Sequence, residues 1–158
     1  MTLSGRTFLV TGAQQGIGAA IAVALAAAGA NVAINWLDDE AAANEVAARA
    51  RARGGQAMTV RADVASRADV EAMVGAVVAQ FGGIDGLVNN AGIYPRNRFL
   101  EIDDAQWDQV FAVNLKGAFI AAQVVIRRLL EQGRGGVILN MSSIAASGSP
   151  RSAHYSAT

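Results

Sequence analysis

The sequence of 158 residues has no cysteine, one histidine and two prolines. Without cysteine there can be no disulfide framework, thiolate metal site or thiol nucleophile. A single histidine, His154, argues against a zinc site. An excess of one charge is also absent, because 13 Lys and Arg balance 13 Asp and Glu. This balance removes the electrostatic basis for binding nucleic acid or an anionic membrane, so we expect no metal, nucleic-acid or membrane partner.

Long hydrophobic runs are scarce as well. The N-terminal segment lacks the charged region followed by an apolar run that marks a signal peptide. The most apolar stretch, residues 17–30, is interrupted by Gly18 and Gly29 and is shorter than the roughly 20 residues of a membrane-spanning helix. We therefore expect a cytoplasmic protein. Hydrophobic residues still make up 53% of the chain and charged residues 16%, which favours a well-covered core over disorder.

Short apolar segments alternate with helical patterns along the whole chain. Strands are predicted over 7–10, 31–36, 56–62, 84–88 and 137–141, and helices over 17–28, 38–53, 67–81, from 104 onward, and over 116–132. This alternation predicts an α/β fold with three layers, in which about five parallel strands are covered by helices on both faces. We expect a single domain.

The first predicted strand runs into a turn that carries Gly12, Gly16 and Gly18. A helix that follows a strand directly points unpaired N–H groups at one spot, and glycines let a pyrophosphate approach that backbone. The spacing Gly-x-x-x-Gly-x-Gly differs from the commoner Gly-x-Gly-x-x-Gly. Alone, the turn fits a phosphate site and an ordinary loop equally well.

Polar or distinctive residues follow the end of every predicted strand. These segments are Thr11-Gly12, Trp36, Asp63-Val64, Asn89-Asn90-Ala91-Gly92 and Ser142-Ser143. Ligands of parallel sheets bind beyond the carboxyl ends of the strands, where these segments meet. Their coincidence at one rim predicts a ligand site more strongly than any single motif does.

With these segments the sequence resembles the classical short-chain dehydrogenase/reductase family. The matching motifs are Thr11 to Gly18, Asn89 to Gly92, Asn114, Ser143 and Tyr155, and they occur in the family's order over essentially the whole chain. The resemblance implies a Rossmann-type, doubly wound sheet with the strand order 3-2-1-4-5, in a single dinucleotide-binding domain over residues 1–158. It further implies NAD or NADP as cofactor and hydride transfer between it and a small alcohol or carbonyl substrate.

The resemblance also implies roles for individual residues. Tyr155 would be the general acid/base, Ser143 would polarise the substrate carbonyl, and Asn114 would hold a water in a proton relay. The implied cofactor-binding residues are Gly12, Gln15, Gly16, Ile17, Gly18, Trp36, Asp63, Val64, Asn90, Ala91 and Gly92. Ser142 is the competing assignment for the role of Ser143. Asn114 could instead be a helix-breaking polar residue between two helices. We expect His154 to lie at the surface.

The family places a lysine one helical turn after the tyrosine, and this sequence ends at Thr158, one residue earlier. A cation there would lower the pKa of about 10 that an unperturbed tyrosine has. We therefore expect the sequence to be a piece of a longer protein. This piece would lack the family's C-terminal strands and would be inactive alone. The alternatives are a non-catalytic dinucleotide-binding module and a cofactor-using epimerase, which the glycine spacing disfavours.

Cofactor preference and assembly can also be predicted. The second strand ends at Trp36. An acidic residue at this position would bind the ribose of NAD, and an arginine would bind the 2′-phosphate of NADP, but neither stands there. Asp38 and Asp39 follow closely, and Gln14 and Gln15 stand where NADP-preferring members often have a basic residue, so NAD is weakly favoured. The family commonly dimerises through the region 104–132, which implies a homodimer or homotetramer.

Overall fold

The computed structural model describes residues 2–158 and contains one five-stranded parallel sheet. The strand order is β3-β2-β1-β4-β5, which confirms the predicted doubly wound topology. The central strand β1 (Thr7–Val10) pairs with β2 (Asn31–Trp36) on one side and with β4 (Gly86–Asn89) on the other, so that Leu9 lies opposite both Ala33 and Leu87. Near-continuous apolar strands of this kind require cover on both faces.

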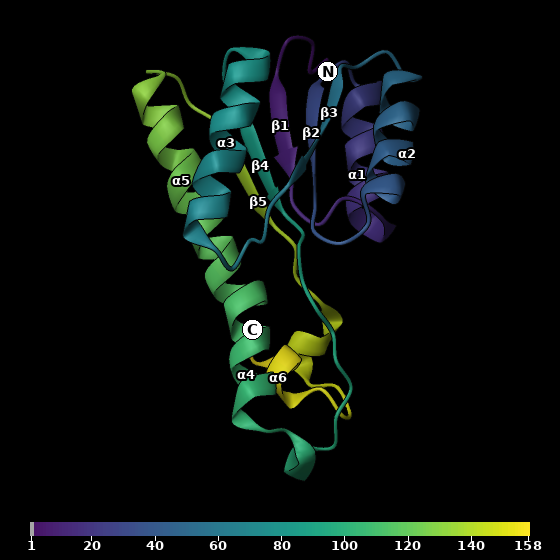
Figure 1. Cartoon of the computed structure of the whole chain (residues 1–158), viewed down its shortest axis with the longest axis vertical. Coiled ribbons are helices and arrows are strands. Elements are labelled where there is room, and N and C mark those ends of the chain that lie inside the picture. The colour runs from purple at the N-terminus through teal and green to yellow at the C-terminus, as the bar shows by residue number, and fades with distance from the viewer. Residues whose placement is uncertain (1) are drawn as a thin grey trace.

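Helices supply that cover in two layers (Figure 1). The remaining elements are α1 (Gly16–Ala27), α2 (Glu40–Arg51), β3 (Ala57–Arg61), α3 (Arg67–Phe81), η1 (Phe99–Glu101), α4 (Asp104–Val110), η2 (Phe111–Gly117), α5 (Ala118–Glu131), β5 (Val137–Asn140), η3 (Ile144–Ser147) and α6 (Ala153–Ser156). Alanines of α1 and α2 pack on one face of the sheet, and larger side chains of α3 and α5 pack on the other. Small side chains let α1 lie close to the sheet.

The two helices predicted around Asn114 form one continuous helix from Asp104 to Glu131. Its middle segment, η2, has π-helical geometry, so the polar residue at 114 is absorbed by a wider turn and does not break the helix. By length and a mean hydropathy of 1.5 this helix could cross a membrane, although a third of that stretch is buried inside the protein. The buried side chains of α5, among them Ile120, Val124 and Val125, belong to the core on one face of the sheet.

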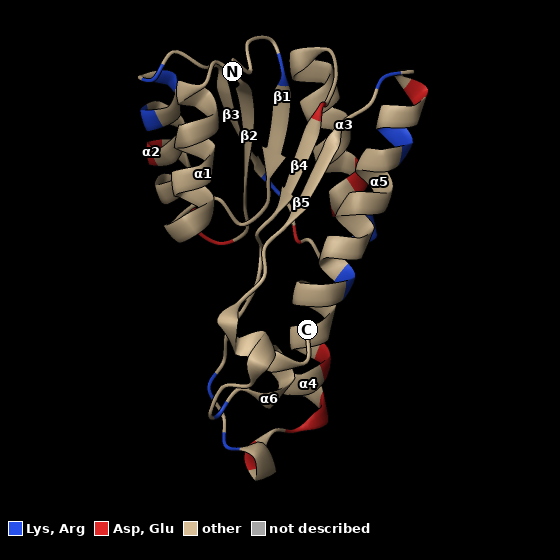
Figure 2. Cartoon of the chain, turned by 180° about the vertical axis from the view of Figure 1, so that it is seen from behind, with Lys and Arg blue, Asp and Glu red and all other residues tan. Residues whose placement is uncertain are grey.

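Beyond the carboxyl ends of the strands the chain extends away from the sheet. Figure 1 shows α4, η1 and α6 gathered below the strands, with α6 packed against α4 and η2. Figure 2 shows Lys, Arg, Asp and Glu scattered over the outer surfaces of the helices and loops, in keeping with the balanced net charge. The extension brings the last predicted motif, around Tyr155, to the same end of the sheet as the glycine turn.

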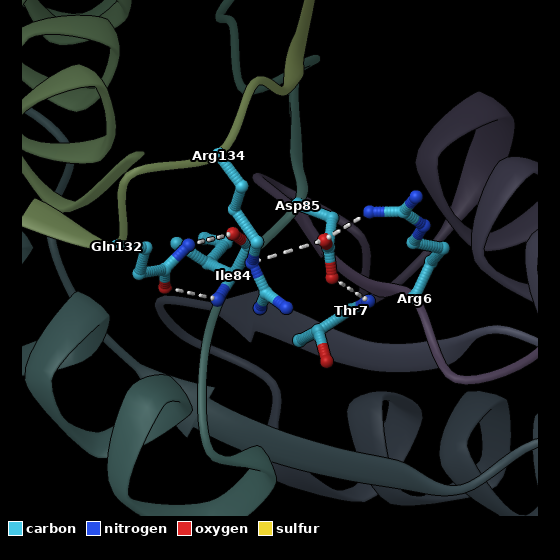
Figure 3. A network of polar contacts seen from close by, with 6 residues as sticks. All are labelled: Arg6, Thr7, Ile84, Asp85, Gln132 and Arg134. Carbon is cyan, nitrogen blue, oxygen red and sulfur yellow. Dashed lines mark hydrogen bonds and ion pairs between the residues drawn. The ribbon is translucent and has the colours of Figure 1, made fainter. Parts of the chain in front are cut away.

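Asp85 joins three segments at the opposite, amino end of the strands (Figure 3). Its carboxylate is nearly buried and accepts hydrogen bonds from Thr7 N–H at 2.9 Å and from Arg6 Nη1 at 2.8 Å. Arg134 lies 3.7 Å from the same carboxylate. Nearby, the side-chain amide of Gln132 accepts a hydrogen bond from Ile84 N–H and donates one to Ile84 O. The start of β1, the entry to β4 and the approach to β5 are therefore fixed together.

Removing this carboxylate should destabilise the sheet. We expect Asp85→Ala to lower the free energy of unfolding by about 1–3 kcal/mol, because Thr7 N–H loses its partner in a buried setting. Urea unfolding followed by circular dichroism measures the change. The matched control is Arg128→Ala, which removes an exposed ion pair with Glu131 and should cost less than about 1 kcal/mol. Equal effects of the two substitutions would contradict the role given to Asp85.

Candidate functional site

The glycine turn after β1 is crowded against the segment after β4. Gly12 has φ +58°, and a Cβ there would lie 2.8 Å from the Cα of Ala91. Gly18, in the first turn of α1, leaves no room either, because a Cβ would come within 2.5 Å of Asn90 Nδ2 and 2.7 Å of Gly12 O. These glycines are therefore needed for close packing between the turn, the helix and the β4 loop.

Polar contacts hold the same two segments together. The hydroxyl of Thr11 accepts hydrogen bonds from the N–H groups of Asn90 and Ala91, each at 3.0 Å. The side chain of Asn90 donates in return to Thr11 O at 2.9 Å and to Gly12 O at 3.0 Å. Both donors of the Asn90 amide are thus used inside the protein, and the residue fixes the shape of the glycine turn.

The N-terminus of α1 is open for an anion. Gly16 has φ +58° and open space around it, and Ile17 is 64% exposed. Within the described residues 2–158, the side chain of Gln15 at the N-cap makes no hydrogen bond to the first turn of α1, which also carries no acidic residue. Unpaired N–H groups at a helix N-terminus attract negative charge. The residues present therefore fit a pyrophosphate at this turn.

Asn35 is a site residue that the sequence analysis missed. It is buried in β2, its Oδ1 accepts from Gly12 N–H at 3.0 Å, and its Nδ2 donates to Ala62 O at 3.0 Å. The side chain therefore ties the glycine turn to the ends of β2 and β3. An asparagine inside an otherwise apolar strand was the available signal, since a buried amide needs hydrogen-bond partners from its neighbours.

Trp36 lies at the end of β2 beside two other elements. The guanidinium of Arg61, from the end of β3, stands 6.0 Å from the Trp36 ring centroid, and its Nε donates to Leu37 O at 3.0 Å. From the glycine turn, Gln14 accepts from Leu37 N–H at 3.0 Å and donates to the carboxylate of Asp38. The side chain of Gln14 thus links the glycine turn to the segment where the adenosine ribose of a dinucleotide is expected.

Asp63 and Val64 follow β3. The Asp63 carboxylate accepts from Ala65 N–H at 2.9 Å, which closes a local turn before α3. Val64 is buried and packs against Gly117 of η2, where a Cβ would come 2.9 Å from Val64 Cγ2. The pair therefore connects the third strand to the π-helical segment.

Asn114 lies in that π-helical segment, a geometry often found at functional sites. Its Oδ1 accepts from Ile93 N–H at 2.9 Å, and its Nδ2 donates to Ile93 O at 3.1 Å and to Thr158 Oγ1 at 3.2 Å. Thr158 Oγ1 donates to Tyr155 O at 2.9 Å. Asn114 thus joins the loop after β4 to the helix that carries Tyr155.

The candidate catalytic residues meet at one cavity of about 430 Å³. Asn114, Ser143 and Tyr155 line it, together with the β4 loop residues Asn90, Ala91 and Gly92. Ser142 lines it too. The other predicted cofactor residues do not line this cavity. They lie at the ends of β1, β2 and β3, in the turns that follow these strands, or in the first turn of α1, and they are Gly12, Gln15, Gly16, Ile17, Gly18, Trp36, Asp63 and Val64.

Ser143 and Tyr155 occupy short helical turns. The Ser143 hydroxyl accepts from Ala145 N–H at 3.1 Å and so caps η3. Tyr155 is half-buried in α6, and its ring centroid lies 4.5 Å from that of Tyr94. Each residue is therefore held by its own turn at the wall of the cavity.

The expectation for His154 is wrong. Its side chain is fully buried, whereas the sequence analysis placed it at the surface. α6 packs against α4, η2 and η3, so the face of this short helix that carries His154 turns inward. A polar residue predicted at the start of a helix gave no sign of that burial.

Comparison with known proteins shows which family the chain belongs to. Residues 6–158 match the family model described as short chain dehydrogenase. The chain is 42% identical over 154 residues to a 3-oxoacyl-(acyl-carrier-protein) reductase of Staphylococcus epidermidis, covering 97% of this chain and 63% of that protein. It is 40% identical over 157 residues to an L-rhamnose 1-dehydrogenase (NAD(P)(+)) of a Sphingomonas species, covering 99% of this chain and 62% of that protein.

A solved structure has the same fold. The crystal structure of a candidate short-chain alcohol dehydrogenase from Sinorhizobium meliloti superimposes with a TM-score of 0.94 at 39% identity, over 99% of this chain and 62% of that one. The chain thus spans somewhat less than two thirds of the length of these relatives. With the family model matched over residues 6–158, the chain belongs to the short-chain dehydrogenase family.

Proposed function

We propose that this chain forms the dinucleotide-binding domain, over residues 1–158, of an NAD(P)-dependent oxidoreductase that interconverts an alcohol and a carbonyl compound. The observation that carries the proposal is the meeting of Asn114, Ser143 and Tyr155 at one cavity bordered by the β4 loop. Family membership favours this function over a binding module without catalysis and over an epimerase. A cytoplasmic location stays a prediction from the N-terminal sequence.

The cofactor would lie along the carboxyl ends of the strands. The open N-terminus of α1, which begins at Gly16, would hold the pyrophosphate through the backbone N–H groups of its first turn, including Gly18. Gly12 would border the pyrophosphate without donating to it, because its N–H is bonded to Asn35 Oδ1. Trp36, Asp63 and Val64 would border the adenosine half, and Asn90, Ala91 and Gly92 the nicotinamide half. When bound, the nicotinamide ring supplies or accepts the hydride.

Proton transfer would fall to the chain's own residues. During reduction Tyr155 would donate its hydroxyl proton to the substrate oxygen, while the Ser143 hydroxyl hydrogen-bonds that oxygen and fixes its position. Asn114 would hold a water that returns a proton towards Tyr155. The bonds that link Asn114 through Thr158 to the backbone of Tyr155 support this arrangement.

NAD is the proposed preference over NADP. The carboxylate of Asp38 is held by Gln14 next to the end of β2, where it would repel a 2′-phosphate. Arg61 opposes this effect with its positive charge, but its guanidinium is engaged with the Trp36 ring and Leu37 O. The chain should therefore favour NAD over NADP only modestly.

Crowding at Gly18 should control cofactor binding. We expect Gly18→Ala to weaken NADH binding by at least roughly tenfold, or about 1.4 kcal/mol, because the new methyl group displaces Asn90 and the glycine turn. Fluorescence titration with NADH measures the affinity, and the same titration with NADPH should give weaker binding to the unaltered chain.

The matched control is Gly75→Ala in α3, where a Cβ meets no atom within 4 Å. This variant should bind NADH normally. Thermal unfolding of both variants separates lost binding from lost folding. If Gly18→Ala binds NADH as tightly as Gly75→Ala does, the proposed pyrophosphate site at the glycine turn is wrong.

Tyr155 should be essential for turnover and dispensable for binding. We expect Tyr155→Phe, measured on the whole protein, to reduce kcat for carbonyl reduction roughly 10²–10⁴-fold, the range for a lost general acid, with NADH affinity unchanged. A spectrophotometric assay of NADH oxidation with a panel of carbonyl compounds measures the loss.

The neighbouring serines provide a paired comparison for the same assay. Ser143→Ala should also lower kcat, whereas Ser142→Ala should not. If Tyr155→Phe turns over at the unaltered rate, or if the two serine variants behave in the reverse way, the assigned roles are wrong.

The exposed side of the long helix should join two copies of the chain. Leu115, Phe119, Ile126 and Leu130 are 45–75% exposed, and Phe111 and Phe119 line a groove on this helix. Contiguous apolar surface of this kind is typical of an interface. We propose a homodimer or homotetramer that uses this surface.

A charge placed on that surface should disrupt the assembly. We expect Phe119→Arg to shift the protein to monomer in sedimentation at micromolar concentration, because burying an unpaired guanidinium is costly. Leu100→Arg, at a 94% exposed position in η1, is the control and should leave the assembly intact. A monomeric unaltered chain would contradict the proposed assembly for this chain.

A further inference from the structure

Tyr94 lies directly against Tyr155. The ring centroids are 4.5 Å apart and the planes are inclined by 62°, the edge-to-face arrangement that aromatic pairs favour. Tyr94 comes from the loop after β4, whereas Tyr155 comes from α6 near the end of the chain. The contact therefore joins two segments that meet only in the folded protein.

The Tyr94 ring is itself held in place. Its hydroxyl lies 3.2 Å from Ser149 Oγ, and Ser152 Oγ donates to Ser149 O at 3.0 Å. The hydroxyl of Ser149, and after it that of Ser152, lowers the pKa of Tyr94 below its usual value by stabilising the phenolate. Ser152 is fully buried and is the N-cap of α6. Tyr94 is thus tied to the residues from which α6 begins.

A second bond joins the same two segments. Asn97 N–H donates to Arg151 O at 2.9 Å, and Arg151 has φ +60°, a left-handed conformation that non-glycine residues rarely adopt. Such a conformation persists only where its surroundings impose it. The loop after β4 therefore constrains the chain immediately before α6.

α6 (Ala153–Ser156), which carries Tyr155, is contacted by several elements. It packs against α4, η2 and η3. Figure 1 shows α6 in the extension beyond the sheet, away from the main core. The direction of the Tyr155 side chain must therefore be set by what packs around it.

Tyr155 stands between two cavities. Tyr155 and Ser143 line both the cavity of about 430 Å³ and a second one of about 420 Å³. Asn114 lines only the first and Tyr94 only the second. Tyr94 thus contacts Tyr155 on the side away from the residues proposed to border the nicotinamide.

We propose that Tyr94 is a positioning residue for Tyr155: its ring, anchored through Ser149 to the start of α6, holds the Tyr155 ring at the boundary of the two cavities and forms part of the wall of the second one. This inference rests on the proposed role of Tyr155 in proton transfer. It assigns to the ring of Tyr94 the orientation of the acid, and to its hydroxyl the anchoring of that ring.

The contact is tested in solution by NMR, since the chain contains only two tyrosines. With labelled tyrosine, the unaltered chain should show a nuclear Overhauser effect between the two rings, and Tyr155→Phe assigns the Tyr94 signals. In Tyr155→Phe the absorbance titration of Tyr94 should have its midpoint below 10, and adding Ser149→Ala should raise it, because a donor to the phenolate is lost. Absence of the Overhauser effect in the unaltered chain would overturn the proposal.

Kinetics, measured on the whole protein, test the consequence of the contact. We expect Tyr94→Leu to lower kcat roughly ten- to a hundredfold, as misplacement of a reacting group does, with NADH affinity and the unfolding midpoint unchanged. Tyr94→Phe keeps the ring and should restore most of kcat. Phe99→Leu, an exposed aromatic in η1, should behave like the unaltered protein.

The outcomes separate this inference from the proposed function. Unchanged kcat in Tyr94→Leu, or an equal loss in Tyr94→Phe, overturns the positioning role even when Tyr155→Phe is inactive. Normal turnover of Tyr155→Phe instead refutes the role of Tyr155 in proton transfer, on which the positioning role depends. A kcat loss in Tyr94→Leu that Tyr94→Phe rescues, together with the Overhauser effect, supports both.

Discussion

The hydrogen bonds between Thr11 and Asn90 hold the site together. They join the carboxyl ends of β1 and β4, the two neighbouring strands from which the chain leaves towards opposite faces of the sheet. At this reversal of strand order the following loops diverge and leave a crevice. Because the Asn90 amide also holds Gly12 O, the shape of the glycine turn depends on the strand next to it.

From this junction the contacts continue to the end of the chain. Ile93, just after the Asn90 segment, is bonded through both backbone groups to Asn114, and Asn114 reaches Thr158. The π-helical segment lets one long helix carry this asparagine while its buried face packs on the sheet. Tyr94, from the same loop, reaches Tyr155 from the other side. A single loop after β4 thus contacts both Asn114 and Tyr155 of the proposed proton-transfer site.

The structure also shows where sequence patterns were incomplete. The parallel sheet followed from the alternation of apolar and helical segments, since parallel strands need crossover helices, and the strand order followed from the family resemblance. By contrast, the sequence pattern treated Asn35 as an ordinary residue of an apolar strand, although its amide ties three strand ends together. The helix from Asp104 to Glu131 was divided at Asn114, because local propensity does not show that a wider turn can accommodate a polar residue.

The sequence by itself determined the sheet, the glycine turn and the set of residues at its rim, because these depend on local periodicity and on residue types that few others can replace. Only the tertiary structure decided that His154 is buried and that Tyr94 lies against Tyr155. It also decided that the Asn90 amide donates to the backbone of the glycine turn. These features come from contacts between segments far apart in the chain. Such contacts leave no periodic signal, so only the folded chain reveals them.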